Sequence, residues 1–134
     1  MHKDMPIDEL RAYRGTVLEP ADFDTFWEVA LRESRAAGGR AQATKVDAGL
    51  NGLDVFDVTY PGFAGEPIKA WLRIPRSADQ PPPLVIEYVG YGGGRGLPID
   101  DLTWAAMGFA HLRMDNRGQG ATWTQGDTPD PYGS

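Results

Sequence analysis

Cysteine is absent from the 134 residues of this sequence, which excludes disulfide bonds and thiolate metal sites. Histidine is scarce as well: with only two in the chain, too few ligands remain for a metal site. No apolar run is long enough to span a bilayer, and the first residues lack the apolar core of a signal peptide. We therefore expect a cytoplasmic protein without a membrane partner, a metal or another cofactor.

Basic residues are also fewer than acidic ones. Lysine and arginine number 13 against 19 aspartate and glutamate residues, which gives a net charge of −6. Nucleic-acid-binding proteins usually carry a basic face, so no nucleic-acid partner is expected. Hydrophobic residues make up 41% and charged residues 24% of the chain, as in soluble globular proteins. A chain of this length is one domain or part of one.

A serine-based catalytic set cannot be assembled from this chain. Its serines, Ser34, Ser77 and Ser134, all lie outside a Gly-x-Ser-x-Gly segment. His2 lies at the amino terminus, and His111 lies within an apolar strand, where a buried, hydrogen-bonded histidine is favoured over a general base. The sequence therefore offers no combination of serine, histidine and aspartate for nucleophilic catalysis.

The first 40 residues, taken as an N-terminal segment, carry a helical pattern. We predict a short helix over residues 6–14 and a longer one that begins at Pro20 and ends at Gly38-Gly39. The apolar residues of the second helix share one face: Phe23, Phe26, Trp27, Ala30 and Leu31. Packing of this face against the body of the protein is favoured over a ligand site.

Residues 41–134 change to the pattern of strands. The predicted elements are strands at 45–50, 53–60, 68–74, 84–89 and 109–114, and a helix at 98–108. Asn51-Gly52 marks a hairpin, and the strand at 84–89 reads as buried. The fold class is therefore α/β: two helices, an antiparallel region, then a βαβ unit with a parallel, right-handed crossover in a sheet covered on both faces. Only loop composition follows, so the sheet lacks further parallel strands.

A glycine-rich loop, residues 90–96, follows the strand at 84–89. It lacks the lysine of a phosphate-binding P-loop, and Arg95 or Leu97 stands where a dinucleotide fingerprint needs its third glycine. The glycines leave backbone N–H groups unshielded at the carboxyl end of a strand. An oxyanion hole for acyl transfer is the functional interpretation that survives, and it is favoured over a tight turn without function.

A second loop motif, Asp115-x-Arg117-Gly118-x-Gly120, follows the last predicted strand. For Arg117 we favour bracing of neighbouring loops, through the five donors of its guanidinium, over direct contact with a substrate. For Asp115, capping of the loop or pairing with Arg117 is favoured over a role as a catalytic acid.

The glycine motifs resemble those of the acetyl xylan esterases and cephalosporin C deacetylases, carbohydrate esterase family seven. The resemblance covers essentially the whole chain. The motifs, in order, are Gly-Tyr-Gly-Gly-Gly-Arg-Gly-Leu-Pro at 90–98, Arg-Gly-Gln-Gly at 117–120 and Gly-Asp-Thr at 126–128. Segments 10–15, 20–27, 57–60 and 68–72 also resemble early parts of that family. The implied fold is the N-terminal portion of an α/β-hydrolase.

The resemblance also implies a chemistry and residues that serve it. Members remove acetyl groups from acetylated sugars or cephalosporin C through an acyl-enzyme on a catalytic serine. The backbone N–H of Tyr91 would supply one oxyanion donor, and Gly92, Gly93, Arg117 and Gln119 would bind substrate or brace the loops. The second donor and the catalytic serine, acid and histidine lie beyond residue 134 in family members.

The resemblance also implies partners, because the catalytic residues of family members lie outside this chain. They are the C-terminal remainder of the esterase, from the same gene or as a second chain, the acetylated substrate, and further copies in a homo-oligomer, a hexamer by resemblance. This chain alone would be inactive. The alternative is a non-catalytic assembly module or an inactive fragment. An enzyme half should regain esterase activity when its complement is supplied, whereas a self-sufficient module should melt cooperatively by itself and show no such gain.

Overall fold

The computed structural model describes residues 4–77, 79–120 and 122–131. The chain divides into two compact units, residues 1–31 and 32–134. The first contains α1 (Ile7–Ala12) and the start of α2 (Phe23–Ala36). Asp8 and Glu9 in the first turn of α1 complement the positive end of the helix dipole. None of the described helices is long and apolar enough to cross a membrane.

The apolar face predicted for the second helix lies on α2. Its aromatic rings contact one another edge to face, with centroids 5.4 Å apart for Phe26 and Trp27 and 6.3 Å apart for Phe23 and Trp27. No residue of α2 is buried. The packing of this face against the body of the protein therefore stays a prediction.

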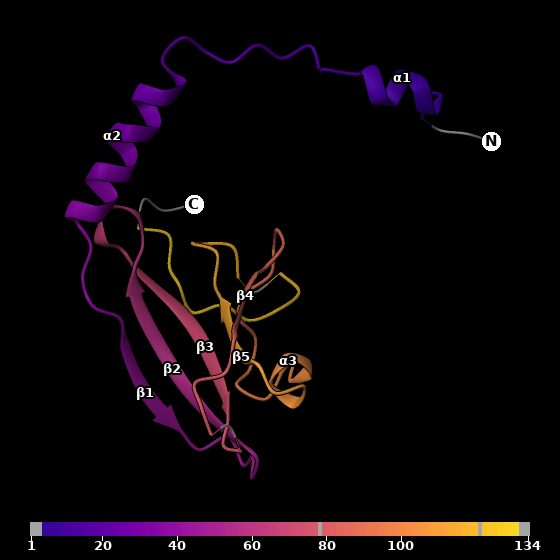
Figure 1. Cartoon of the computed structure of the whole chain (residues 1–134). Helices are drawn as coiled ribbons and strands as arrows, with labels where there is room; N and C mark the ends of the chain where they lie inside the picture. The colour runs from indigo at the N-terminus through magenta and orange to yellow at the C-terminus, as the bar shows by residue number, and fades with distance from the viewer. Residues whose placement is uncertain (1–3, 78, 121, 132–134) are drawn as a thin grey trace. The chain divides into compact units, whose positions relative to one another are not determined.

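The second unit is built on one five-stranded mixed sheet with the order β1-β2-β3-β5-β4 (Figure 1). Its strands are β1 (Gln42–Val46), β2 (Leu53–Pro61), β3 (Pro67–Pro75), β4 (Leu84–Tyr88) and β5 (Ala110–Met114). The pairs β1–β2, β2–β3 and β3–β5 are antiparallel, and β4–β5 is parallel. The mixed α/β architecture and the parallel pairing of the βαβ unit agree with the predictions from sequence.

The first hairpin differs from its prediction in length. The strand predicted at 45–50 is β1 at 42–46, so residues 47–52 connect β1 to β2 in place of a two-residue turn at Asn51-Gly52. The chain turns earlier because the carboxylate of Asp47 accepts the N–H of Gly49 at 3.0 Å, and Gly49 adopts a left-handed φ of 69°. The local side-chain bond therefore ends the strand before the Asn-Gly signal is reached.

The helix of the βαβ unit is much shorter than predicted. It is α3 (Thr103–Ala106), whereas the sequence pattern favours 98–108. The carboxylate of Asp100 accepts the N–H of Leu97 at 2.8 Å, and Asp101 has a left-handed φ of 54°. A left-handed residue cannot belong to a right-handed helix, so α3 begins only after it. Gly108, with a φ of 93°, ends the turn that follows.

The strand predicted to be buried, residues 84–89, is partly exposed. It is β4, and its alternate residues Leu84, Ile86 and Tyr88 are 53%, 47% and 71% exposed. These three residues share one face of the strand, and β4 is also the last strand in the order, with β5 as its only partner in the described part of the chain. One face of this edge strand is therefore left without cover.

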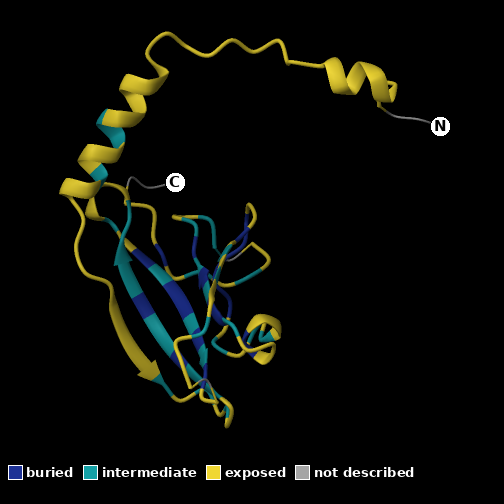
Figure 2. Ribbon diagram, viewed as in Figure 1, coloured by how far each residue is buried: buried dark blue, intermediate teal, exposed yellow. Residues whose placement is uncertain are grey.

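The core of the sheet combines apolar and charged side chains. Figure 2 shows the buried residues concentrated on β2, β3 and β5 and on the loops at their ends, while β1 is exposed. Val55 and Ala70 are buried apolar residues. Arg73, His111 and Asp115 are buried completely, with no exposed surface. Buried ionised groups need polar partners, and those partners organise the loops described next.

Candidate functional site

Two loops leave the sheet at the same edge. Residues 90–96, called the glycine loop, follow β4, and residues 115–120 follow β5. Because β4 and β5 are parallel neighbours, their carboxyl ends lie side by side, and α/β proteins use this edge of a sheet for binding and catalysis. A third stretch, residues 122–128, contacts both loops and is called the supporting segment.

The N–H groups at the end of the glycine loop are all bonded within the protein. Gly94 donates to the hydroxyl of Thr124 at 2.7 Å, and Gly96 donates to the carbonyl of Gln125 at 2.8 Å. The N–H of Gly93 closes a tight turn on the carbonyl of Gly90 at 3.0 Å. These bonds fix the course of the loop.

The carbonyl groups at the start of the loop are held from the other side. The indole N–H of Trp123 donates to the carbonyl of Tyr91 at 2.9 Å, and its backbone N–H donates to the carbonyl of Gly92 at 3.3 Å. The peptide units on both sides of Gly92 are therefore oriented by one residue of the supporting segment.

The N–H groups of Tyr91 and Gly92 differ from those at the end of the loop in their hydrogen bonding. Neither has an acceptor among the residues that the structure describes. Both residues line a cavity of about 130 Å³, together with Gly118, Gln119, Gly120 and Thr122. The structure thus brings the predicted site residues Tyr91, Gly92 and Gln119 to one cavity, whereas Gly93 and Arg117 are not among its described lining.

The close approach of the loops explains why glycine stands at positions 94 and 120. A Cβ on Gly94 would lie 2.2 Å from the carbonyl oxygen of Gln125, and a Cβ on Gly120 would lie 2.4 Å from the Cα of Gly126. Both contacts are with backbone atoms, which cannot rotate away. Only glycine at these positions lets the three segments pack main chain to main chain.

Asp115 joins the glycine loop to the supporting segment. Its Oδ1 accepts the N–H of Arg95 at 2.6 Å. Its Oδ2 accepts the N–H of Asp127 at 2.8 Å and the hydroxyl of Thr128 at 3.0 Å. The carboxylate, buried completely, is thus surrounded by donors and acts as a cap for two segments at once.

Arg95 is a site residue that the sequence analysis missed. Its side chain is buried, its Nη1 donates to Asp57 at 2.7 Å and to the carbonyl of Ala70 at 3.0 Å, and its Nε donates to Asp127 at 2.8 Å. The guanidinium also lies 4.0 Å from the ring centroid of Trp71. The sequence shows an arginine within a glycine run, but no local pattern indicates which distant carboxylates pair with it.

Residues 1–133 match the family model described as acetyl xylan esterase. The chain belongs to the acetyl xylan esterase family. Two solved structures are similar to it. The acetyl xylan esterase from Paenibacillus sp. R4 is 38% identical with a TM-score of 0.75, over 90% of this chain and 39% of that one. Acetyl xylan esterase 1 from Thermoanaerobacterium sp. JW/SL YS485 is 34% identical with a TM-score of 0.75, over 89% of this chain and 37% of that one. The chain thus spans less than two-fifths of either esterase.

In this member of the acetyl xylan esterase family, Arg117 ties its loop to a neighbouring turn. Its guanidinium pairs with Glu66, between β2 and β3, and its Nε lies 3.9 Å from the carboxylate of Asp130. Gln119 lines the cavity, and its N–H is 3.5 Å from the carbonyl of Asn116. The two residues of the Arg-Gly-Gln-Gly motif therefore have different surroundings: Arg117 contacts other loops, and Gln119 borders the free N–H groups.

A second charged cluster lies under the residues that follow the glycine loop. Arg73 donates to the carbonyls of Leu97 and Pro98, both at 3.1 Å. Burial and the neighbouring Arg113 lower the pKa of Arg73 to about 10. His111 is buried as predicted, with its Nε2 3.1 Å from Glu87 and its Nδ1 without a partner among the described residues. The bonds of this cluster go to residues 97, 98 and 101 and to Glu87, outside the glycine loop, and none of these residues is among the described lining of the 130 Å³ cavity.

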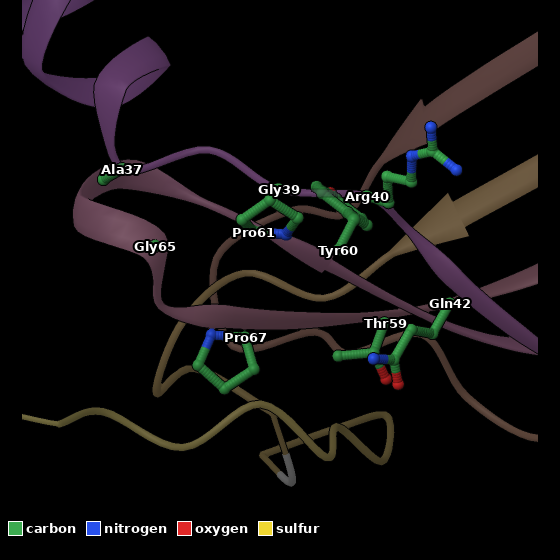
Figure 3. Close-up of a pocket in the computed structure, with 9 residues that line it drawn as sticks. All are labelled: Ala37, Gly39, Arg40, Gln42, Thr59, Tyr60, Pro61, Gly65 and Pro67. Atoms are coloured by element: carbon green, nitrogen blue, oxygen red, sulfur yellow. The ribbon is translucent and has the colours of Figure 1, made fainter.

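A larger cavity of about 280 Å³ lies elsewhere at the edge of the sheet (Figure 3). It is formed by the start of β1, the ends of β2 and β3 that meet at the connecting turn, and Ala37, Gly39 and Arg40. It shares no described lining residue with the glycine-loop cavity. Within the described residues there is also no group of three or more metal-binding side chains. The glycine-loop cavity is the candidate active site because Tyr91 and Gly92 line it and the loop follows a parallel strand at its carboxyl end.

The contacts of Asp57 with Lys69 and Arg95 predict that the folded protein loses stability in acid. Burial raises the pKa of Asp57, but hydrogen bonds from Lys69 and Arg95 outweigh it and hold the pKa below the ordinary 3.8. Because the folded pKa is the lower one, the pair stabilises the fold above pH 3.8 and loses this effect as the pH falls through the folded pKa. We expect Asp57→Asn to lower the melting temperature near neutral pH and the difference from wild type to shrink in acid. Melting curves of both proteins across this range check it, and a difference independent of pH would contradict it.

Proposed function

We propose that this chain is the N-terminal part of a serine esterase that removes acetyl groups from acetylated sugars or cephalosporin C. In this proposal the backbone N–H of Tyr91 stabilises the oxyanion. The observation that carries it is the contrast within one loop: Gly93 to Gly96 donate to protein acceptors, while the N–H groups of Tyr91 and Gly92 have none among the described residues and belong to residues that line a cavity. Such prepared donors are what an oxyanion hole requires.

In the proposed reaction this chain contributes one function, the stabilisation of the oxyanion. A serine hydroxyl from the C-terminal part adds to the acetyl carbonyl, and a histidine of that part takes the proton. The carbonyl oxygen becomes an oxyanion beside Tyr91. Collapse breaks the ester bond, the histidine gives its proton to the departing alkoxide oxygen so that the alcohol leaves, and water then releases acetate from the acyl-enzyme. Because the charge on oxygen grows only toward the intermediate, a fixed N–H donor stabilises the intermediate more than the ester.

The edge of β4 supports the proposal that an α/β-hydrolase sheet continues beyond this chain. Natural sheets rarely leave an apolar edge strand uncovered. Leu84, Ile86 and Tyr88 are exposed on β4, and β5 is its only described partner. The solved esterases are more than twice as long as the part that this chain matches. We therefore place the C-terminal remainder of the esterase, with the catalytic triad, against this edge.

A chimera tests the proposed function. Residues 1–133 of this chain replace the matched part of the Paenibacillus sp. R4 esterase, and turnover of p-nitrophenyl acetate and acetylated xylan is measured. We expect the chimera to hydrolyse both substrates and the 134-residue chain alone to hydrolyse neither. The chimera supplies the serine, histidine and acid that this chain lacks.

The control is the same chimera with alanine at the serine proposed as nucleophile in the C-terminal part, which should lose turnover and keep its melting temperature. A chimera that melts cooperatively but hydrolyses neither substrate would refute the proposal. A chain that melts cooperatively by itself and gains nothing from the C-terminal part would instead favour the non-catalytic assembly module.

A further inference from the structure

We infer that Arg95 is a positioning residue for the oxyanion hole, a role that rests on the proposed function of the glycine loop. Its buried guanidinium, paired with Asp57 and Asp127, holds the loop in the conformation that leaves the N–H groups of Tyr91 and Gly92 without acceptors among the described residues. Arg95 acts through the backbone and does not contact the substrate.

The contacts of the guanidinium join three parts of the unit. Nη1 donates to Asp57 on β2 at 2.7 Å and to the carbonyl of Ala70 on β3 at 3.0 Å. Nε and Nη2 lie 2.8 and 2.7 Å from Oδ2 of Asp127 in the supporting segment. The planar face lies over the ring of Trp71. The end of the glycine loop is thus attached to the sheet by a side chain that is only 4% exposed.

Arg95 and Asp127 are linked twice. Their side chains form the ion pair, and their backbone N–H groups both donate to the carboxylate of Asp115, at 2.6 and 2.8 Å. This double link sets the distance between the glycine loop and the supporting segment. The supporting segment in turn holds the carbonyl of Tyr91 through the indole N–H of Trp123. A shift at Arg95 can therefore reach the peptide units beside Tyr91 along the glycine loop and also through Trp123, which holds the unit that carries the N–H of Gly92.

The chemistry of arginine suits this task better than that of lysine. A guanidinium presents five donors in a fixed plane, so it can bind two carboxylates and a carbonyl while its face stacks on an aromatic ring. A lysine ammonium lacks both the plane and the number of donors. Oxyanion stabilisation depends on donors fixed before the reaction, and a displacement of about 1 Å costs on the order of 10²-fold in rate. Loss of Arg95 should therefore appear in kcat.

The test uses the chimera with Arg95→Met and Arg95→Lys, and Arg113→Met as the matched control. Arg113 is also largely buried and pairs with two carboxylates, those of Glu87 and Asp101, on the same sheet. Neither partner belongs to the glycine loop: Glu87 lies on β4, and Asp101 lies between that loop and α3. We expect Arg95→Met to lower kcat roughly ten- to a hundredfold with KM within about threefold, and Arg95→Lys to restore only part of it. Arg113→Met should lower the melting temperature by a similar amount and leave kcat within about twofold.

A second readout is the kcat of the variants in millimolar guanidinium ion. We expect the ion to raise the kcat of Arg95→Met, because it replaces the missing cation, and to leave the kcat of Arg113→Met unchanged. The inference is overturned if Arg95→Met keeps kcat, or if both variants lose kcat in proportion to their melting temperatures. If the wild-type chimera shows no turnover, the proposed function fails, and amide hydrogen exchange decides the structural part. Residues 90–94 should then exchange faster in Arg95→Met than in Arg113→Met, and equal rates would overturn the inference.

Discussion

Replacement of Gly94 by alanine should nearly abolish esterase turnover in the chimera. The added Cβ would lie 2.2 Å from the carbonyl oxygen of Gln125 and 2.5 Å from the Cα of Gly126. Because both neighbours are backbone atoms, the glycine loop must move as a whole, and the N–H of Tyr91 moves with it. Loss of one oxyanion donor typically lowers kcat by about 10²–10³-fold, and overpacking of this kind costs about 1–3 kcal/mol of folding free energy. Steady-state kinetics and thermal melts measure the two effects.

Gly52→Ala is the matched control for Gly94→Ala. A Cβ on Gly52 meets no atom within 4 Å, and this glycine is not left-handed. Its substitution should leave both kcat and the melting temperature almost unchanged. Gly93→Val should disturb the same loop, because the Cβ of residue 93 would lie 2.7 Å from the indole ring of Trp123 and 3.2 Å from the carbonyl oxygen of Gly90, and displacement of that ring would break its bond to the carbonyl of Tyr91. Full turnover in Gly94→Ala at wild-type stability would contradict the proposed site.

Asp115→Asn should cause a large loss of stability. The carboxylate is buried completely and accepts three hydrogen bonds, two of them from the backbone N–H groups of Arg95 and Asp127. An asparagine must turn its NH₂ group toward at least one of these donors. Since hydrogen bonds to a charged group contribute about 1.5–3 kcal/mol each, we expect a loss of roughly 3–5 kcal/mol and a decrease in kcat. Denaturant unfolding of the chimera measures the first, and steady-state kinetics the second.

Asp47→Asn serves as the control for Asp115→Asn. Asp47 accepts only the N–H of Gly49 at an exposed turn, and an asparagine amide oxygen can do the same. Its free energy of unfolding should stay within about 0.5 kcal/mol of wild type. A similar small effect at Asp115 would show that the two loops are held together without its carboxylate.

Much of the fold was predictable because it depends on neighbours in the chain. The strands follow from residues of alternating or continuous apolar character, and the parallel pairing of β4 and β5 follows from the helix between them. The bounds of α3 and β1 were predicted wrongly because a single residue interrupted the helical or strand pattern in each. Asp101, in a left-handed conformation, delays α3, and the bond from Gly49 to Asp47 ends β1 early. Neither effect changes the composition of the segment, so a pattern search does not detect it.

For the candidate site, the sequence by itself determined where the glycine loop lies, because a run of glycines directly after an apolar strand is a local signal. It also placed Tyr91 in that loop. Only the tertiary structure decided which N–H groups lack an acceptor among the described residues and which side chain holds the loop. Arg95 reaches Asp57 across 38 residues and Asp127 across 32, and its N–H reaches Asp115 across 20. Those contacts exist because β2, β3 and β5 bring their ends together, and the pairing of strands is a property of the folded sheet that no short segment of the chain contains.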